Sequence, residues 1–221
     1  GNHFSSAKDL ATMTSLLINN FPETYSLYKE KYYTFNNIRQ PNRNRLLWKD
    51  NSSDGVKTGH TESAGYCLIS SAKRNDMRLI AVVAGANSDK ERFNDTQRLL
   101  EYGFRFYSTQ EVIKKDNALK DVDIWGGKEN QVSLGVENNI KLTLPRTTFR
   151  NITISYDFQN NLRAPIKEGQ TLGTLVIKEG EKTLHTENLV ALSEVEAKGF
   201  FGRLWASFVL WLRGLFGLED A

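Results

Sequence analysis

The stretch of the sequence with the clearest chemical potential is Lys57-Thr58-Gly59, which is followed directly by His60. Lysine supplies positive charge, threonine supplies a hydroxyl donor, and glycine leaves room for a ligand backbone beside a strand. In a row on an edge strand, these groups would form a ledge that binds a carboxylate. We therefore take Lys57, Thr58, Gly59 and His60 as the candidate site.

The composition limits the kind of protein that can carry this stretch. The 221 residues are 39% hydrophobic and 25% charged, which predicts one or two folded domains. The net charge is only +3, and no segment interleaves basic and aromatic residues, so a nucleic-acid partner is not expected. A single cysteine, Cys67, excludes an intrachain disulfide. Together with only three histidines it gives no metal-ligand spacing, so we expect neither a metal nor another cofactor.

Residues 1–110 are predicted to form an α+β domain that positions the Lys-Thr-Gly stretch. Capping patterns at Ser6 and Ser88 mark two helices, the first ending at Pro22 and the second spanning residues 89–106. The Lys-Thr-Gly strand and two following extended runs would form a three-stranded antiparallel meander. The remaining assignments are a strand at residues 30–35, turn or loop at residues 36–45, and a return to the core at Leu46-Leu47-Trp48.

Residues 111–193 have a different sequence pattern and are predicted to form a small all-β, sandwich-like domain. Short alternating runs are separated by Gly-Gly, Asn-Asn, Lys-Glu-Gly and Glu-Gly-Glu, which are turn chemistries typical of hairpins. The segment shows no convergent set of acids, histidines or nucleophiles. We therefore interpret it as a spacer or interaction module rather than as a second active site.

The tail, residues 194–221, is predicted to be an amphipathic helix. Its large apolar side chains fall on one half of a helical wheel, which is typical of a helix lying in a membrane interface. Arg203 and Arg213 leave fewer than about 17 uninterrupted apolar positions, so a transmembrane span is not expected. The alternative is a helix packed on protein. The predicted membrane-docking residues are Phe200, Phe201, Leu204, Trp205, Phe208, Trp211, Leu212, Leu215 and Phe216.

An ordered set of motifs resembles a known family over essentially the whole chain. The set comprises Asn42-Arg43-Asn44, Leu46-Leu47-Trp48, Asp54-Gly55-Val56-Lys57-Thr58-Gly59-His60-Thr61, Ala64-Gly65-Tyr66, Met77-Arg78-Leu79-Ile80 and Gly103-Phe104-Arg105-Phe106. It resembles the low-molecular-mass penicillin-binding proteins of the D-alanyl-D-alanine carboxypeptidase type, in the class of penicillin-binding protein 5. The resemblance implies part of a penicillin-binding/β-lactamase-like transpeptidase domain, then an all-β domain and an amphipathic helix.

The resemblance also implies a mechanism. A serine in a Ser-x-x-Lys motif would attack the peptide bond between two terminal D-alanines of a peptidoglycan stem peptide, and β-lactam antibiotics would trap the acyl-enzyme. Lys57 would contribute positive potential and Thr58 would hold the substrate carboxylate. The backbone around Gly59 and His60 would form the strand edge and part of an oxyanion hole. Arg92 matches an arginine that helps hold the carboxylate, with Arg43 as a second candidate.

The sequence departs from the family pattern because neither a nucleophile motif nor Ser-x-Asn lies at the expected distance before Lys57. Ser5-Ser6-Ala7-Lys8 fits Ser-x-x-Lys as a string, but we interpret it as a helix start. Residues 1–6 show no signal-peptide pattern and are expected to begin in mid-domain. We therefore expect the C-terminal portion of a longer enzyme, with the N-terminal portion of the catalytic domain as its partner, at the periplasmic face of the bacterial inner membrane.

Other interpretations stay open at this point. The chain could be a non-catalytic, membrane-associated scaffold, or it could belong to a β-lactamase-like enzyme. His60 could take part in proton transfer, although a backbone role is favoured. Cys67 is predicted to be a small buried hydrophobe. His3 and His185 have no partner in sequence and are expected at the surface.

Overall fold

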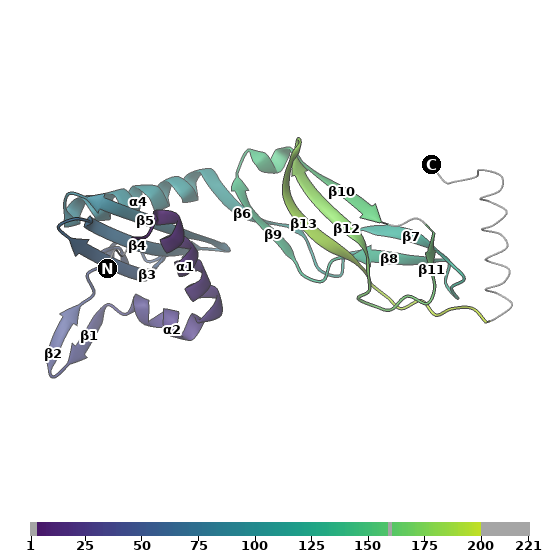
Figure 1. The fold of residues 1–221 in the computed structure, drawn as a ribbon, viewed down its shortest axis with the longest axis horizontal. Helices are drawn as coiled ribbons and strands as arrows, with labels where there is room; N and C mark the ends of the chain where they lie inside the picture. Colours follow the sequence, from purple (N-terminus) through teal and green to yellow (C-terminus); the bar gives the residue numbers. More distant parts are fainter. Residues whose placement is uncertain (1–3, 159–160, 200–221) are drawn as a thin grey trace. The chain divides into compact units, whose positions relative to one another are not determined.

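A computed structural model describes residues 4–158 and 161–199 (Figure 1). The predicted docking residues from Phe200 onward and His3 lie outside the described residues. The chain divides into two compact units, each with its own core. The first runs to Thr109 and includes Thr143–Arg146, and the second contains Gln110–Leu142 and the residues from Thr147 onward.

A three-stranded antiparallel sheet forms the centre of the first unit. Its strands are β3 (Ser53–Thr61), β4 (Gly65–Arg74) and β5 (Met77–Ala86), in the order β3-β4-β5. Helix α1 (Ala7–Asn20) packs against β5, and helix α4 (Asp89–Phe106) packs against β4 and β5. The predicted meander and α+β class are confirmed. The core between these elements is built from Leu46, Leu68, Ala72, Ala81 and Leu100, with Leu79, Phe93 and Phe104 packed against it.

Both predicted helix starts are confirmed by their caps. The Ser6 side chain accepts a hydrogen bond from Asp9 N, and the Asp9 carboxylate accepts one in return from Ser6 N. Ser88 Oγ accepts from Glu91 N at the start of α4. These bonds satisfy amide groups that the first turn of a helix leaves without a partner. The Ser5-Ser6-Ala7-Lys8 string is therefore a helix start, as the sequence analysis favoured.

The segment between α1 and β3 differs in part from the prediction. Short helices α2 (Pro22–Ser26) and η1 (Leu27–Lys29) come first, followed by β1 (Tyr32–Phe35) in the region predicted as a strand. Residues 36–45 are not all turn or loop, because β2 (Ile38–Pro41) pairs antiparallel with β1. The prediction went wrong because the Asn36-Asn37 turn, with positive φ at both residues, joins two strands of a hairpin rather than leaving the sheet.

Helix α3 (Leu46–Lys49) returns to the core only in part. Leu46 and Leu47 are buried, as predicted, but Trp48 is 37% exposed. Its ring lies edge-on to Tyr32 with 6.0 Å between ring centroids. Trp48 therefore packs against the β1–β2 hairpin instead of entering the core.

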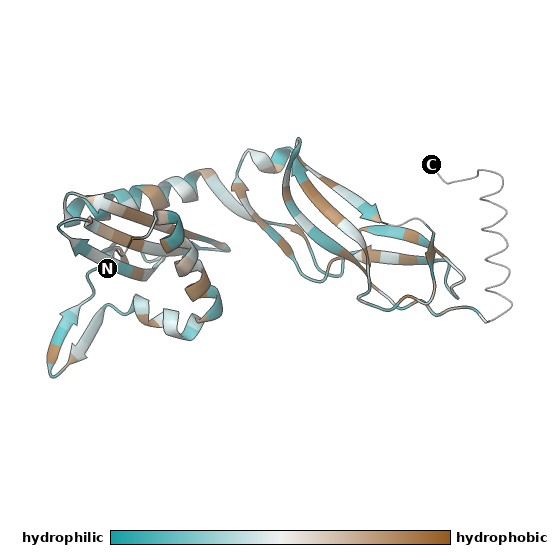
Figure 2. Ribbon diagram, in the orientation of Figure 1, coloured by the Kyte–Doolittle hydropathy of each residue, from teal (hydrophilic) through white to brown (hydrophobic). Residues whose placement is uncertain are grey.

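The second unit is all-β, as predicted. Its six-stranded sheet has the order β10-β12-β13-β8-β7-β11, whereas β6 and β9, which pair with each other, each contain residues assigned to both units. Alternating polar and apolar residues along these strands, visible in Figure 2, give each strand one buried side. The elements are β6 (Tyr107–Ile113), β7 (Lys120–Trp125), β8 (Gln131–Gly135), β9 (Ile140–Pro145), η2 (Thr148–Arg150), β10 (Ile152–Phe158), β11 (Leu162–Arg163), β12 (Thr171–Glu179) and β13 (Lys182–Ala191).

Residues 4–158 and 161–199 contain neither a helix that could span a membrane nor a cluster of metal ligands. No helix in these ranges has both the length and the apolar character needed to cross a bilayer. Within the same described ranges, no group of three or more His, Cys, Asp or Glu residues is arranged to hold a metal ion.

Candidate active site

The predicted site residues of the first unit come together around one cavity of about 460 Å³. Strand β3 is an edge strand of its sheet, so the Lys-Thr-Gly stretch lies where the sequence analysis placed it. Tyr66 also lines the cavity and was not among the predicted site residues. A register argument could have found it, because Tyr66 is paired with His60 across β3 and β4. The lining residues are Arg43, Lys57, Thr58, Gly59, His60, Tyr66 and Arg92.

The start of β3 is fixed by a polar cluster. Tyr25 Oη donates to Asp54 Oδ1 at 2.6 Å, and Arg78 Nη1 donates to both Asp54 oxygens at 2.9 and 2.8 Å. Burial, and then the hydrogen bond to Asp54, raise the pKa of the Tyr25 hydroxyl above its usual value. A Cβ at Gly55 would lie only 2.9 Å from Tyr25 Oη. Glycine is therefore needed at this position for Tyr25 to pack against the strand.

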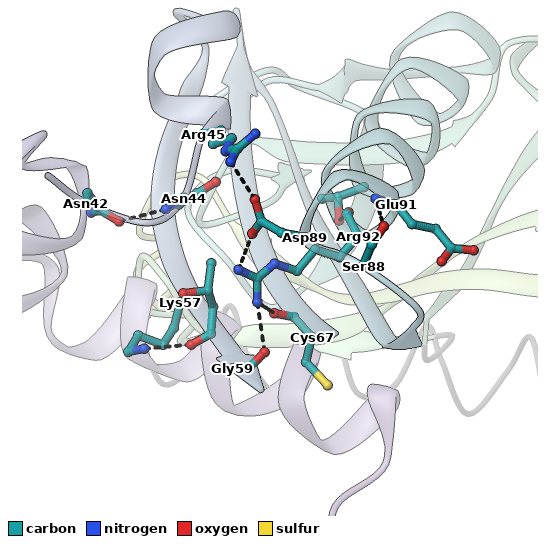
Figure 3. Close-up of polar contacts among 12 residues, drawn as sticks. Asn42, Asn44, Arg45, Lys57, Gly59, Cys67, Ser88, Asp89, Glu91 and Arg92 are labelled. Atoms are coloured by element: carbon teal, nitrogen blue, oxygen red, sulfur yellow. Dashed lines mark hydrogen bonds and ion pairs between the residues drawn. The ribbon is translucent and has the colours of Figure 1, made fainter. Parts of the chain in front are cut away.

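The loop that carries Arg43 is tied to the same strand. Asn44 is fully buried and donates from Nδ2 to Gly55 O at 2.8 Å, while its Oδ1 accepts from Leu46 N at 3.1 Å. Asn44 N in turn donates to Asn42 Oδ1 at 3.0 Å (Figure 3). These bonds satisfy a buried amide side chain and hold the exposed Arg43 next to the cavity.

The cavity is positively charged. Arg43 and Lys57 are exposed, and Arg92 adds a third cation. None of the seven described lining residues is acidic. Lys57 Nζ donates to Thr58 O at 2.6 Å, and Thr58, which also lines the cavity, is 9% exposed. Such an arrangement attracts an anion such as a carboxylate.

His60 packs against Tyr66 at the rim of the cavity. The two ring centroids are 4.0 Å apart with the planes inclined by 38°, and the Arg92 guanidinium lies 5.3 Å from the centroid of the Tyr66 ring. The contact fixes the direction of the His60 ring. The two roles considered for His60, proton transfer by the ring and a contribution of its backbone to the site, stay predictions.

Arg92 is buried, at 6% exposure, and acts as a clamp on the sheet. Its Nη1 donates to Gly59 O at 2.8 Å and to Cys67 O at 3.2 Å, which are residues paired across β3 and β4 (Figure 3). Its Nη2 donates to the Asp89 carboxylate. The predicted contact of Arg92 with a substrate carboxylate stays a prediction, while its bonds to the strand are observed.

Two minor predictions need correction. Cys67 is half-buried rather than buried, and its Sγ lies 3.4 Å from Ala64 O, because it sits close to the exposed turn between β3 and β4. His185 does have a partner, since its Nε2 lies 3.2 Å from Glu187 Oε2 on the same face of β13. Residues two apart on a strand share a face, so this pair could have been predicted.

The fold and the motif together define a class of protein. Residues 1–88 match the family described as D-alanyl-D-alanine carboxypeptidase, and residues 107–197 match the C-terminal domain of penicillin-binding protein 5. The first part of the chain is thus similar to this carboxypeptidase family and the later part to this C-terminal domain, and the predicted fold class and resemblance are confirmed.

Particular relatives agree with this assignment. The chain is 44% identical to the D-alanyl-D-alanine carboxypeptidase DacC of Escherichia coli (strain K12), over 97% of this chain and 54% of the relative. It is 42% identical to DacA of the same strain, over 91% of this chain and 50% of the relative. The chain thus spans about half the length of the curated relatives it matches.

A solved structure is also similar. The crystal structure of penicillin-binding protein 5 from Haemophilus influenzae matches with a TM-score of 0.75 and 36% identity, over 88% of this chain and 58% of that chain. Penicillin-binding protein 6B from Escherichia coli matches with a TM-score of 0.61 and 34% identity, over 84% of this chain and 50% of that chain.

Proposed function

We propose that the chain is part of a serine-type D-Ala-D-Ala carboxypeptidase that removes the terminal D-alanine from peptidoglycan stem pentapeptides. The observation that carries the proposal is the Lys57-Thr58-Gly59 edge strand beside a cavity lined by three cations and no acid among its described residues. A peptide ending in D-Ala-D-Ala presents both a backbone that can lie along such an edge and a carboxylate that the cations can hold.

The proposed reaction is acyl transfer. A serine hydroxyl attacks the carbonyl carbon of the penultimate D-alanine, the C–N bond breaks, and the terminal D-alanine leaves after its nitrogen gains a proton. Water then hydrolyses the ester and restores the serine. Lys57 supplies positive potential, Thr58 and the two arginines, Arg92 and Arg43, hold the carboxylate, and the backbone at Gly59 and His60 lines the strand edge. β-Lactams would acylate the same serine.

The attacking serine would come from outside residues 1–221. Ser5, the serine of the Ser5-Ser6-Ala7-Lys8 string, stands next to the helix cap Ser6 and is not among the described residues that line the cavity. The curated relatives are about twice as long as the aligned region. We therefore propose that residues 1–110 form one wall of the catalytic cleft and that the N-terminal portion of the same enzyme forms the other.

Fluorescent penicillin labelling tests this division of the site. The full-length protein should be labelled with one penicillin per chain, and residues 1–221 alone should not be labelled. Stoichiometric labelling of residues 1–221 alone would show that the nucleophile lies within them. A full-length protein that is neither labelled nor able to release D-alanine would instead support the alternative of a non-catalytic, membrane-associated scaffold.

Replacement of Lys57 tests the role of the edge strand. In the full-length enzyme, Lys57→Ala should slow acylation by penicillin about 10²-fold or more, because the cation next to the reacting carbonyl is lost. Lys73→Ala is a matched control, since Lys73 is an exposed lysine on β4 and does not line the cavity. Near-normal acylation of Lys57→Ala would refute the role.

We also propose a location at the periplasmic face of the inner membrane, with residues 111–193 as a spacer and a docking helix that starts later than predicted. Residues 194–199 are not helical, because Val195 pairs with Ile166 and Ala197 with Gly127 in the second unit, so the proposed docking helix is confined to residues 200–221. The apolar half of the predicted wheel, from Phe200 to Phe216, would enter the lipid interface. Deleting residues 200–221 should release the full-length enzyme from anionic vesicles while hydrolysis of a soluble D-Ala-D-Ala peptide continues. Retained vesicle binding would refute the docking helix.

A further inference from the structure

The carboxylate of Asp89 connects two arginines that belong to different parts of the first unit. One carboxylate oxygen accepts from Arg92 Nη2, and the other lies 2.9 Å from Arg45 Nη2 (Figure 3). Arg92 is on α4 and holds the paired carbonyls of Gly59 and Cys67. Arg45 directly follows the loop that carries Arg43. One side chain thus links the edge strand and the arginine loop.

Helix capping does not account for this carboxylate. Asp89 is the first residue of α4, where an acidic side chain is generally favourable. The cap itself is complete without it, because Ser88 Oγ accepts from Glu91 N and the Glu91 carboxylate accepts from Asn87 N. The Asp89 oxygens face the two guanidinium groups instead.

The burial of Arg92 makes the link necessary. The Arg92 side chain is 8% exposed, whereas Asp89 is 33% and Arg45 is 65% exposed. A buried guanidinium without a counter-ion is strongly unfavourable, so Arg92 needs the Asp89 charge to stay in place. Without it, Arg92 would turn toward water and release the carbonyls of Gly59 and Cys67.

We propose that Asp89 is a positioning residue for the carboxypeptidase site. It acts through Arg92 on the edge strand at Gly59, where the substrate backbone would lie, and through Arg45 on the loop that presents Arg43 to the substrate carboxylate. The proposal rests on the proposed function. Asp89 itself is not among the described residues that line the cavity, so it acts on the substrate only through these neighbours.

The test compares variants of the full-length enzyme. Asp89→Asn keeps the shape of the side chain and removes its charge. Each rate is divided by the concentration of active sites, which is measured by titration with a saturating amount of penicillin. Unfolded protein then does not contribute to the rate. We expect Asp89→Asn to lower the second-order rate constant of acylation by fluorescent penicillin roughly tenfold to a hundredfold, as expected for a displaced reacting group. Asp89→Glu should recover part of the loss because the charge returns.

Arg45→Ala removes the contact of Asp89 with Arg45 and keeps its contact with Arg92. Arg45 reaches only the loop, so its loss should raise KM for a soluble D-Ala-D-Ala peptide several-fold and change kcat little. Asp89→Asn should affect both KM and kcat, because it also frees Arg92. This difference is a readout that a general loss of stability would not produce.

Two controls isolate the link from the stability of α4. Asp95→Ala removes another acid of the helix, whose partner is the exposed Arg98 at 3.5 Å. It should leave acylation unchanged. Ser88→Ala removes the cap and should lower the melting temperature without slowing acylation per titrated site.

Each outcome decides the proposal. Asp89→Asn with wild-type acylation, or with a loss no greater than that of Ser88→Ala, overturns it while the proposed function stands. A wild-type enzyme that is not acylated and does not hydrolyse the peptide overturns both. If Asp89→Asn does not fold, Arg45→Ala carries the test because its side chain is largely exposed, and an unchanged KM then overturns the proposal.

Discussion

Gly55 and Gly59 both lie on β3, but the surroundings of the two glycines differ. A Cβ at Gly55 would meet Tyr25 Oη at 2.9 Å and Tyr28 Cβ at 3.3 Å, inside a packed polar cluster. A Cβ at Gly59 would have as its nearest neighbour Cys67 Cβ at 3.8 Å, an ordinary contact distance. One glycine is therefore required by the protein's own packing, and the other is open toward the cavity.

At the residue scale, we predict opposite effects of alanine at these two positions. Gly55→Ala should lower the free energy of unfolding by about 1–3 kcal/mol, because Tyr25 and its bond to Asp54 must shift. Gly59→Ala should change it by no more than about 0.5 kcal/mol, yet slow acylation by penicillin because the added methyl group stands at the strand edge. Urea unfolding and penicillin labelling of the full-length enzyme check the pair. Equal destabilisation by the two variants would contradict the prediction.

At the scale of the elements, helix α4 has two tasks. Its first turn carries Asp89 and Arg92, which hold the edge strand, and its middle packs Leu100 into the sheet. Helix packing supplies most of the stability of such a helix, so the polar link at its start depends on the apolar contact further along. The cap at Ser88 marks the residue before which the helix cannot begin and stabilises the first turn, whereas Asp89 and Arg92 are held by their own contacts.

The neighbouring leucines of α4 provide a test of this dependence. Leu100 is 2% exposed and Leu99 is 48% exposed. Leu100→Ala should lower the free energy of unfolding by about 2–5 kcal/mol through the lost contacts and the cavity that remains. Leu99→Ala should change it by less than about 0.5 kcal/mol. Denaturant titration of both variants measures the two free energies of unfolding. An equal loss for Leu99→Ala would contradict the assignment of the Leu100 face of α4 to the core.

At the scale of the whole molecule, two separate clusters of buried residues hold the chain. The first includes Leu46, Leu68 and Leu100, and the second includes Leu134, Leu175 and Leu189. Each unit therefore has a core of its own, which is the usual condition for an independently cooperative unit.

We predict that the two cores can be destabilised separately. Leu175→Ala, at a position with 0% exposure, should shift the thermal transition of the second unit and leave penicillin labelling at low temperature intact. Leu100→Ala should instead shift the transition that accompanies loss of labelling. Calorimetry and labelling after heating would detect the difference. A single transition shifted equally by both substitutions would show that the cores unfold together.

The sequence predicted what depends on local patterns. Caps at Ser6 and Ser88, the alternating strands and the Lys-Thr-Gly edge strand could be read directly, because each arises from residues a few positions apart. The first strand of the β1–β2 hairpin was predicted, but the second, β2, was assigned to turn or loop because Asn and Arg residues surround it. Arg45 and Asp89, which form an ion pair, are 44 positions apart in sequence. Arg92, the other partner of Asp89, bonds to Gly59 on the edge strand β3. No periodicity reports such a pairing, so the structure was needed to find it.

The position of Cys67 has a practical consequence for spectroscopy. It is the single thiol of the 221 residues, it is half-buried, and it is paired with Gly59 across β3 and β4. A small fluorinated alkyl group attached there would lie beside the edge strand without altering Lys57 or Thr58. Its fluorine resonance would then give a direct signal of ligand occupancy, read in solution and without turnover.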